Sequence, residues 1–261
     1  MSSSHDERLS AVKKDYLVKL AKKGKRLDGR GPDEYRPITI EKHLIKNAEG
    51  SAKVTIGNTM VMAGVKLDVG EPYPDTPEEG AMTTSAELPP IASPTFETGP
   101  PREDAIELAR VVDRGIRESK FIKLDQLCIT PGEEVWIVFI DLHVLDYDGN
   151  LFDACSLAAS AALQDAIIPG ERLGKGENRP LPLGSPPISC TFAKYADFIV
   201  VDPRLEEDEV AEARHTVAID ENGDLRAMQK GLTGSFTVEE IKNNIKRAQI
   251  HAKNIRKLLE E

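Results

Sequence analysis

The sequence lacks the long apolar runs, clustered cysteines and positive net charge by which many membrane, metal-binding and nucleic-acid-binding proteins are recognised. No apolar run approaches the roughly 20 residues that a membrane helix needs, and residues 1–20 contain no apolar core typical of a signal peptide. The cysteines, at 128, 155 and 190, are far apart and have no histidine at the spacing of a zinc site. We therefore expect a cytoplasmic globular protein with no membrane segment, metal or cofactor.

The negative charge is unevenly distributed. The net charge is -10, yet residues 1–30 contain nine Lys or Arg and four acids, whereas residues 202–224 contain nine acids and two arginines. A polyanion responds to local cationic patches more than to total charge. Overall acidity therefore does not exclude a polyanionic partner such as a nucleic acid.

A row of arginines is the most informative local feature. The pattern "ELARVVDRGIRESK" at 107–120 predicts a helix over 103–119. At about 100° per residue, Arg110, Arg114 and Arg117 fall within an arc of roughly 60°. The apolar residues on another side of this helix are Ile106, Ala109, Val112 and Ile116. We expect the three arginines to face outward together.

A simpler interpretation of this row needs no ligand. Glu107 with Arg110, Asp113 with Arg117 and Arg114 with Glu118 have the spacing of ion pairs that stabilise an exposed helix by a few tenths of a kcal/mol each. Periodicity alone favours this interpretation.

The order of elements predicts an α+β protein with two similar halves. In residues 26–169, "GSAKVTIGNTMVMAGVKLD" predicts two strands joined at Gly57-Asn58, "EEVWIVFIDLHVLDYDGN" predicts a strand, and "FDACSLAASAALQDAII" predicts a buried helix closed by Pro169-Gly170. A Pro- and Gly-containing linker follows at 170–187. Before these elements, a helical arm with Leu9, Val12, Tyr16 and Leu20 on one stripe occupies residues 1–25.

The second half, residues 188–261, repeats the plan in a shorter form. Strands are expected in "ISCTFAKYADFIVVD" and a hairpin in "HTVAIDENGDLRAMQK". A last helix opens with Thr237 and Glu240 in capping-box spacing. Its apolar stripe consists of Ile241, Ile245, Ala248, Ala252 and Ile255.

Four segments together resemble the RNase PH family. They are "RLDGR" (26–30), "GNTMVMAGV" (57–65), "YDGNLFDACSLAASAAL" (147–163) and "VDPRLEEDEVAEARHTV" (201–217). The segments "EPYPDTP", "ASPTFETGPP" and "ELARVVDRGIRES" are more similar still to one branch, the non-catalytic RNase PH-like subunit of the archaeal exosome core. The resemblance extends from about residue 26 to the end.

The resemblance implies a fold, an assembly and partners. The expected fold is RNase PH-like, with two strand-and-helix halves that assemble into a hexameric ring. The expected partners are a catalytic RNase PH-like subunit, with three copies of each in the ring, RNA-binding cap subunits and single-stranded RNA. In active members, phosphate attacks the RNA 3' end and releases nucleoside diphosphates in the 3' to 5' direction.

The chain departs from active relatives at two catalytic positions. Where they carry Gly-Thr-Arg or Gly-Ser-Arg to hold phosphate, this chain has Asn150, Leu151 and Phe152. Where they carry two aspartates six residues apart, it has Asp208 and Arg214. We therefore expect no catalytic residue and no metal site, and interpret the acidic run "EEDEVAE" as an exposed helix start.

The resemblance also assigns a role to the arginine row. In this branch the corresponding helix grips the RNA backbone, so Arg110, Arg114 and Arg117 become candidate phosphate contacts, the first two most of all. Tyr73 and Phe96, on loops, are expected to pack against their own domain. Two alternatives remain: a stand-alone phosphorolytic 3' to 5' exoribonuclease, and a purely structural scaffold without RNA contact.

Overall fold

The computed structural model describes residues 13–260 of the chain. Leu9 and Val12 of the predicted helical arm lie outside the described residues. Residues 13–21 are helical, and Gly24 follows with a positive φ of 67°, as expected for the end of a helix.

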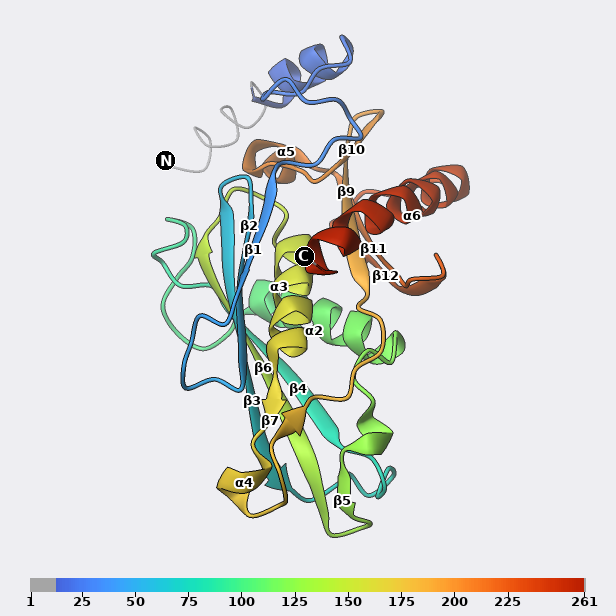
Figure 1. Ribbon diagram of the computed structural model, residues 1–261. Coiled ribbons are helices and arrows are strands. Elements are labelled where there is room, and N and C mark those ends of the chain that lie inside the picture. Colours follow the sequence, from blue (N-terminus) through green and yellow to red (C-terminus); the bar gives the residue numbers. More distant parts are fainter. Residues whose placement is uncertain (1–12, 261) are drawn as a thin grey trace.

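The larger sheet is built from the first half of the chain (Figure 1). Its strands are β1 (Ile38–Lys42), β2 (Gly50–Ile56), β3 (Thr59–Gly70), β4 (Ala81–Glu87), β5 (Cys128–Thr130) and β6 (Glu134–Asp146). The order is β1-β2-β3-β6-β4, with β5 paired to β6, and β4 runs parallel to β6. The predicted β2–β3 hairpin at Gly57-Asn58 is confirmed, and alternate residues of β3 are buried.

The second sheet is smaller and wholly antiparallel. It contains β9 (Ile188–Tyr195), β10 (Phe198–Val201), β11 (Ala213–Ile219) and β12 (Leu225–Gly231), in the order β10-β9-β11-β12. The predicted hairpin is therefore present as β11 and β12. Its edge strand β12 is largely exposed, whereas β9 is buried along almost its whole length.

Two helices lie between the sheets. Helix α3 (Leu151–Asp165) contacts β2 and β3 on one side and β9 on the other, while α2 (Glu103–Glu118) contacts β4 and β12. Every residue of α3 from 152 to 163 is buried, as its Ala and Ser content predicts. The approach to β2 is so close that a Cβ on Gly50 would lie 2.2 Å from the Ala162 carbonyl oxygen.

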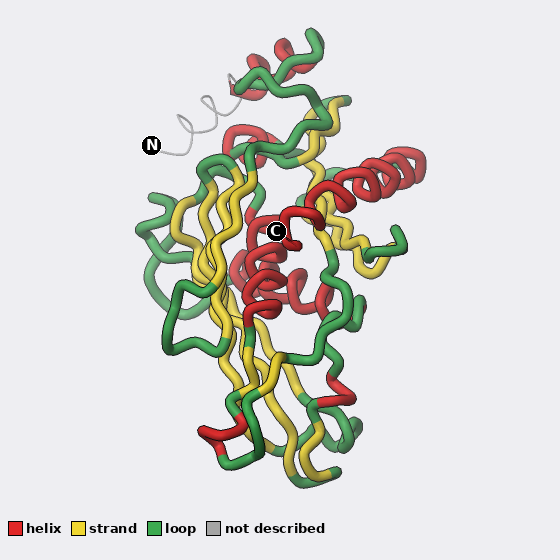
Figure 2. Tube along the Cα trace, in the orientation of Figure 1, coloured by secondary structure: helices red, strands yellow, loops and turns green. Residues whose placement is uncertain are grey.

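Helix α6 (Val238–Glu260) covers the opposite face of the second sheet from α3. Ser189 of β9 donates to or accepts from Ser156 of α3, whereas the next residue, Cys190, points to the Ala248 carbonyl of α6. The predicted capping box is confirmed, because Glu240 N–H donates to Thr237 Oγ1 and Thr237 N–H donates to Glu240 Oε2. Helices and strands thus alternate in layers (Figure 2).

The short elements correct the predicted boundaries. They are η1 (Leu124–Gln126), β7 (Ile167–Ile168), α4 (Gly170–Leu173), β8 (Arg179–Pro180) and α5 (Leu205–Val210). The helix expected to continue to Pro169 ends at Asp165, because the residues after it form hydrogen bonds with distant segments. Ile167 N–H donates to the Glu49 carbonyl, and the Ala166 carbonyl accepts from Leu181 N–H. Local periodicity does not report such long-range pairing.

Two predicted apolar stripes were partly wrong. Ile106 is 49% exposed, because α2 buries a face centred nearer Leu108 and Gly115. In the helix at 13–21, Tyr16 is 55% exposed and Leu17 is buried instead, against Tyr195 and neighbours of the second sheet.

The two loop aromatics differ from one another. Phe96 packs against its own domain as predicted, stacked on Tyr147 with ring centroids 5.3 Å apart. Tyr73 does not, since it is 56% exposed in the loop after β3.

Candidate functional site

A cavity of about 150 Å³ lies where the first turns of α2 and α3 approach β11. It is lined by carboxylates, aromatic rings and one cation, among them Asp104, Glu107, Tyr147, Phe152, Asp208 and Arg214. The structure therefore brings together Leu151, Phe152, Asp208 and Arg214, four of the five positions compared above with active relatives. No group of three or more His, Cys, Asp or Glu in residues 13–260 is arranged to hold a metal ion.

The guanidinium of Arg214 already has two partners inside this cavity. Its Cζ lies 4.2 Å from the centroid of the Phe152 ring, a cation–π contact, and its Nη2 lies 2.9 Å from Glu107 Oε2. Gly231, which pairs with Arg214 from β12, provides the space for this side chain, because a Cβ at position 231 would lie 2.7 Å from Arg214 Nη2. Phe152 and Glu107 thus hold the cation in one place between α2 and α3.

Asp208 lies on α5 at the floor of the cavity. Burial raises the pKa of its carboxyl group to about 6, although a hydrogen bond from the Asn150 N–H and the charge of Arg214 oppose the rise. The Asn150 N–H to Asp208 Oδ2 distance is 3.1 Å. The single acid retained from the pattern of active relatives therefore holds its proton more tightly than an exposed aspartate does.

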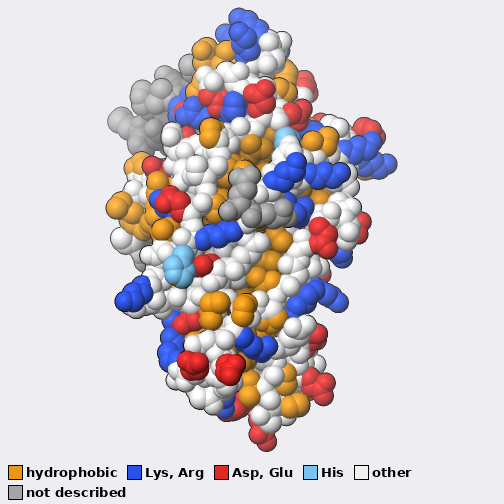
Figure 3. Space-filling model, viewed as in Figure 1, with side chains coloured by type: hydrophobic (Ala, Val, Ile, Leu, Met, Phe, Trp, Pro, Cys, Tyr) orange, Lys and Arg blue, Asp and Glu red, His pale blue; other side chains and the backbone are white. Residues whose placement is uncertain are grey.

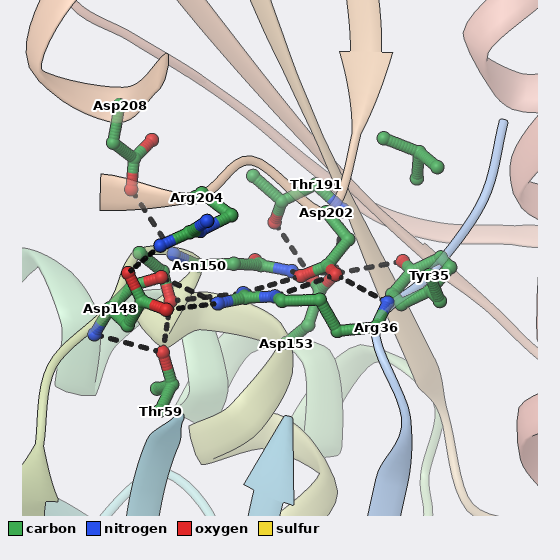
Figure 4. A network of polar contacts seen from close by, with 12 residues as sticks. Tyr35, Arg36, Thr59, Asp148, Asn150, Asp153, Thr191, Asp202, Arg204 and Asp208 are labelled. Atoms are coloured by element: carbon green, nitrogen blue, oxygen red, sulfur yellow. Dashed lines mark hydrogen bonds and ion pairs between the residues drawn. The ribbon is translucent and has the colours of Figure 1, made fainter. Parts of the chain in front are cut away.

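A buried ion-pair network adjoins Asp208 through Asn150, whose N–H donates to that carboxylate (Figure 4). Asp202, which is fully buried, accepts hydrogen bonds from Arg36 Nη2 at 2.7 Å, Arg30 Nη1 at 2.9 Å and Asn150 Nδ2 at 2.8 Å. Burial opposes ionisation, but the hydrogen bonds and charge of Arg36 outweigh it and lower the pKa of Asp202. A charged carboxylate thus joins the two sheets.

Asn150 links this network to α3. It has a left-handed backbone, φ 54°, and its side chain donates to Asp153 Oδ2 at 2.8 Å as well as to Asp202. Asp153 also accepts hydrogen bonds from Tyr35 and Thr191. The residue at the first position of the expected phosphate-binding motif is therefore part of the structural junction between the halves.

The acidic run at 206–212 begins the short helix α5, as predicted, but it is only partly exposed. Glu207 is buried and forms a two-point ion pair with Arg26, whose Nε donates to Glu207 Oε1 at 2.8 Å. That pair anchors "RLDGR" to α5. The predicted exposure is wrong for Glu207, because Arg26, which is far away in sequence, meets it here.

All three arginines of α2 are exposed, as the helical spacing predicted. Only one of the three expected ion pairs forms: Arg117 Nε lies 3.0 Å from Asp113 Oδ2. Arg114 Nη1 donates to Gln229 Oε1 of β12 at 3.1 Å. Arg110 has no hydrogen-bond or ion-pair partner among the described residues.

Arg110 is unpaired because Glu107, its expected partner, binds other side chains. Glu107 Oε2 binds Arg214, and Glu107 Oε1 lies 3.5 Å from Gln229 Nε2, whose oxygen in turn contacts Arg114. The sequence analysis missed this role of Glu107, although its position one turn before Arg110 was visible. The arginine row thus begins at the rim of the cavity.

The two sheets that enclose α2 and α3, with a polar cavity at their junction, define the RNase PH class of α+β protein. The chain belongs to the 3' exoribonuclease family: residues 34–169 match the pattern described as "3' exoribonuclease family, domain 1", and residues 185–250 match domain 2.

Several relatives are similar over nearly the whole chain. "Exosome complex component Rrp42" of Thermoplasma volcanium is 54% identical over 250 residues, 96% of each chain, and its counterpart in Pyrococcus furiosus is 49% identical over 98% of this chain and 95% of its own. Among solved structures, an Archaeoglobus fulgidus exosome with RNA bound to the active site has a TM-score of 0.93 at 45% identity, covering 95% of this chain and 98% of its own. A structure described as an archaeal exosome core has a TM-score of 0.91 at 41% identity, covering 98% and 99%.

Proposed function

We propose that this chain is a non-catalytic subunit of an archaeal exosome core, in which it helps a catalytic partner degrade RNA from the 3' end. It pairs with an active phosphorolytic RNase PH-like subunit, three copies of each forming a hexameric cytoplasmic ring that also carries RNA-binding cap subunits. The names of the relatives and the full-length likeness to exosome structures support this assembly. The exposed Leu225 and Met228 on edge strand β12 are consistent with a partner that covers them.

The non-catalytic role rests on one observation above all, the engaged guanidinium of Arg214. Phosphorolysis requires a free cation and donors that hold inorganic phosphate beside a polyanion. Here the cation in the cavity is stacked on Phe152 and paired with Glu107, and Leu151 provides no hydroxyl group. A positive charge at position 214 also disfavours a metal ion next to Asp208.

The RNA-binding role belongs to the α2 arginines. Arg110 and Arg114 are exposed and carry no ion pair among the described residues, so no carboxylate competes with an RNA phosphate for them. Arg117 is the weaker candidate, because Asp113 already binds it. A guanidinium binds phosphate through two hydrogen bonds without reading a base, which suits sequence-independent degradation.

The domain division proposed here is an N-terminal helical arm at 1–25, domains at 26–169 and 188–261, and a linker at 170–187. The family matches at 34–169 and 185–250 support it.

The double variant R110A/R114A tests RNA binding in the complex reconstituted with the catalytic partner. We expect weaker binding of single-stranded RNA and a salt dependence of log K that is less steep by about 1.4, because each lost phosphate contact contributes about 0.7. Fluorescence anisotropy over a salt series measures both quantities. R117A is the matched control, and its effect should be smaller.

Unchanged affinity and salt slope in the double variant would refute this role. They would favour the scaffold without RNA contact.

A further inference from the structure

Helix α6 carries an unusual concentration of positive charge for this acidic chain. Residues 241–259 contain six Lys or Arg and no Asp or Glu, although the whole chain has 44 acids and 34 basic residues. Exposed helices commonly place acids three or four residues from lysines, which forms stabilising pairs. Lys246 and Lys253 have no acid three or four residues away, whereas Lys242 has Glu239 and Lys257 has Glu260 and Glu261 at that spacing.

The lysines of α6 share one face. At about 100° per residue, Lys242, Lys246, Lys253 and Lys257 fall within an arc of about 60° and span about 22 Å along the helix. All four side chains are exposed, and none has a hydrogen bond or ion pair with the side chains described, those of residues 13–259. We call these four residues the α6 lysine face. Figure 3 shows Lys and Arg side chains gathered over this helix.

The two arginines of the same helix behave differently. Arg247 binds Asp33 and lies over the Phe192 ring, with its Cζ 4.9 Å from the centroid. Arg256 donates to the carbonyls of Pro186 and Ile219. Both arginines therefore connect α6 to other elements of the protein, whereas the lysines project into solvent.

We propose that the α6 lysine face is a second binding site for the RNA phosphate backbone, separate from the α2 arginines. Lysine is depleted from protein–protein interfaces, whereas nucleic-acid interfaces are strongly positive. Ile250 is the one large exposed apolar side chain of α6 between the lysines, too little for an apolar interface core. The face has no aromatic side chain, so it binds without base preference.

The location of the face makes the site independent of the first. Helix α6 covers one side of the second sheet, and α2 and α3 pack against the other, so the lysines and the α2 arginines lie on opposite sides of that sheet. The inference depends on the proposed function only in taking RNA as the polyanion.

The test uses the full purified chain and the variant K242Q/K246Q/K253Q/K257Q, with fluorescein-labelled oligouridylate as the probe. Glutamine keeps helix propensity and removes the charge. We expect about tenfold or greater loss of affinity at low salt, and a salt slope less steep by up to about 2.8, that is, about 0.7 for each of four phosphate contacts. Circular dichroism checks that α6 remains folded.

Two matched variants show whether the site depends on position. K242R/K246R/K253R/K257R keeps the charges and should retain binding. K19Q/K23Q/K46Q/K120Q removes four exposed lysines scattered over other segments and should change the slope by less than about 0.7. Equal losses in the scattered and α6 variants would overturn the proposal, because net charge alone would then explain binding.

Repeating the measurement in the R110A/R114A background separates this proposal from the α2 role. If only the α6 lysine substitutions lower RNA affinity, the result supports the α6 site and counts against the arginines. If only R110A/R114A lowers RNA affinity, the α6 site is overturned. Wild-type RNA binding by the α6 variant, together with failure to join the complex, also overturns it and identifies an acidic protein surface as the occupant.

Discussion

At the scale of single residues, Arg214 affects both the cavity and the RNA-binding row. It fills the space beside Asp208 and neutralises Glu107, which would otherwise be free to pair with Arg110. Arg214 therefore occupies the cavity and also leaves Arg110 without its expected carboxylate partner. Glu107, Arg214 and Arg110 form one electrostatic unit, although no two of them are adjacent in sequence.

Replacing Arg214 by leucine tests this coupling. In R214L, Glu107 loses its partner and is one helical turn from Arg110, a spacing at which ion pairs form. We expect RNA affinity of the reconstituted complex to fall about two- to threefold, since an exposed pair is worth a few tenths of a kcal/mol. The second substitution E107Q should restore binding in R214L, as measured by anisotropy; if it does not, Arg214 acts on RNA by another route.

The pKa of Asp208 gives a second prediction at this scale. Burial raises the folded-state pKa to about 6, so between about pH 4 and 6 the folded chain holds a proton that the unfolded chain has released. This contribution to stability is complete below about pH 4 and is lost as the pH rises through about 6. In D208N it is absent, so the stability of the variant relative to wild type should increase over that range and then level off.

Urea unfolding at intervals from about pH 4 to about pH 7 measures the difference. D197N, at an exposed turn, controls for the substitution itself. A difference between D208N and wild type that does not change with pH would contradict the assigned burial of Asp208.

At the scale of elements, the contact between β2 and α3 depends on the absence of one side chain. A Cβ on Gly50 would lie 2.2 Å from the Ala162 carbonyl oxygen and 2.8 Å from Ala166 backbone atoms, which cannot move independently. G50A should therefore cost about 1–3 kcal/mol or more in the free energy of unfolding, as overpacking does. The strain would spread to α3 and hence to Asn150 and Phe152 at its start.

Gly64 provides the matched control within the same sheet. It lies on β3, and a Cβ there would meet nothing within 4 Å. G64A should be neutral or slightly stabilising, because glycine in a strand costs conformational entropy. Denaturant unfolding of both variants measures the contrast, and equal stability of G50A and G64A would show that the sheet and helix separate freely.

Elements with strong local patterns could be predicted from sequence, and those set by distant contacts could not. The β2–β3 hairpin, the buried α3 and the capped α6 each carry a periodicity or turn signal in their own residues. Strand β4, "AMTTSAE", has no such pattern, and its parallel pairing with β6 joins residues more than 50 positions apart.

The same limit applies to the site. Spacing placed the three arginines on one exposed face of α2, and the resemblance brought Phe152, Asp208 and Arg214 to attention. The partners that decide their chemistry lie far away in sequence: Glu107 with Arg214, and Arg36 with Asp202, 166 residues apart. The lysine spacing of α6 was readable beforehand, but only the structure shows which cations of that helix are already paired.

At the scale of the whole molecule, negative and positive charges are separated by role. Acids are used inside for structure, as in Asp202 and Glu207, while exposed cations without an ion pair lie on the surface, among them Arg110 and Arg114 of α2 and the α6 lysine face. Within residues 13–260, no helix combines the length and apolar character needed to cross a membrane. A net charge of -10 thus coexists with exposed lysines and arginines on α2 and α6.

Release of nucleoside diphosphates from single-stranded RNA in the presence of phosphate tests the central claim most directly. The purified chain alone and the chain reconstituted with a catalytic RNase PH-like partner are compared under the same conditions. We predict no release by the chain alone and steady release by the complex. Steady release by the chain alone, abolished by D208N, would contradict the account and identify it as a phosphorolytic enzyme in its own right.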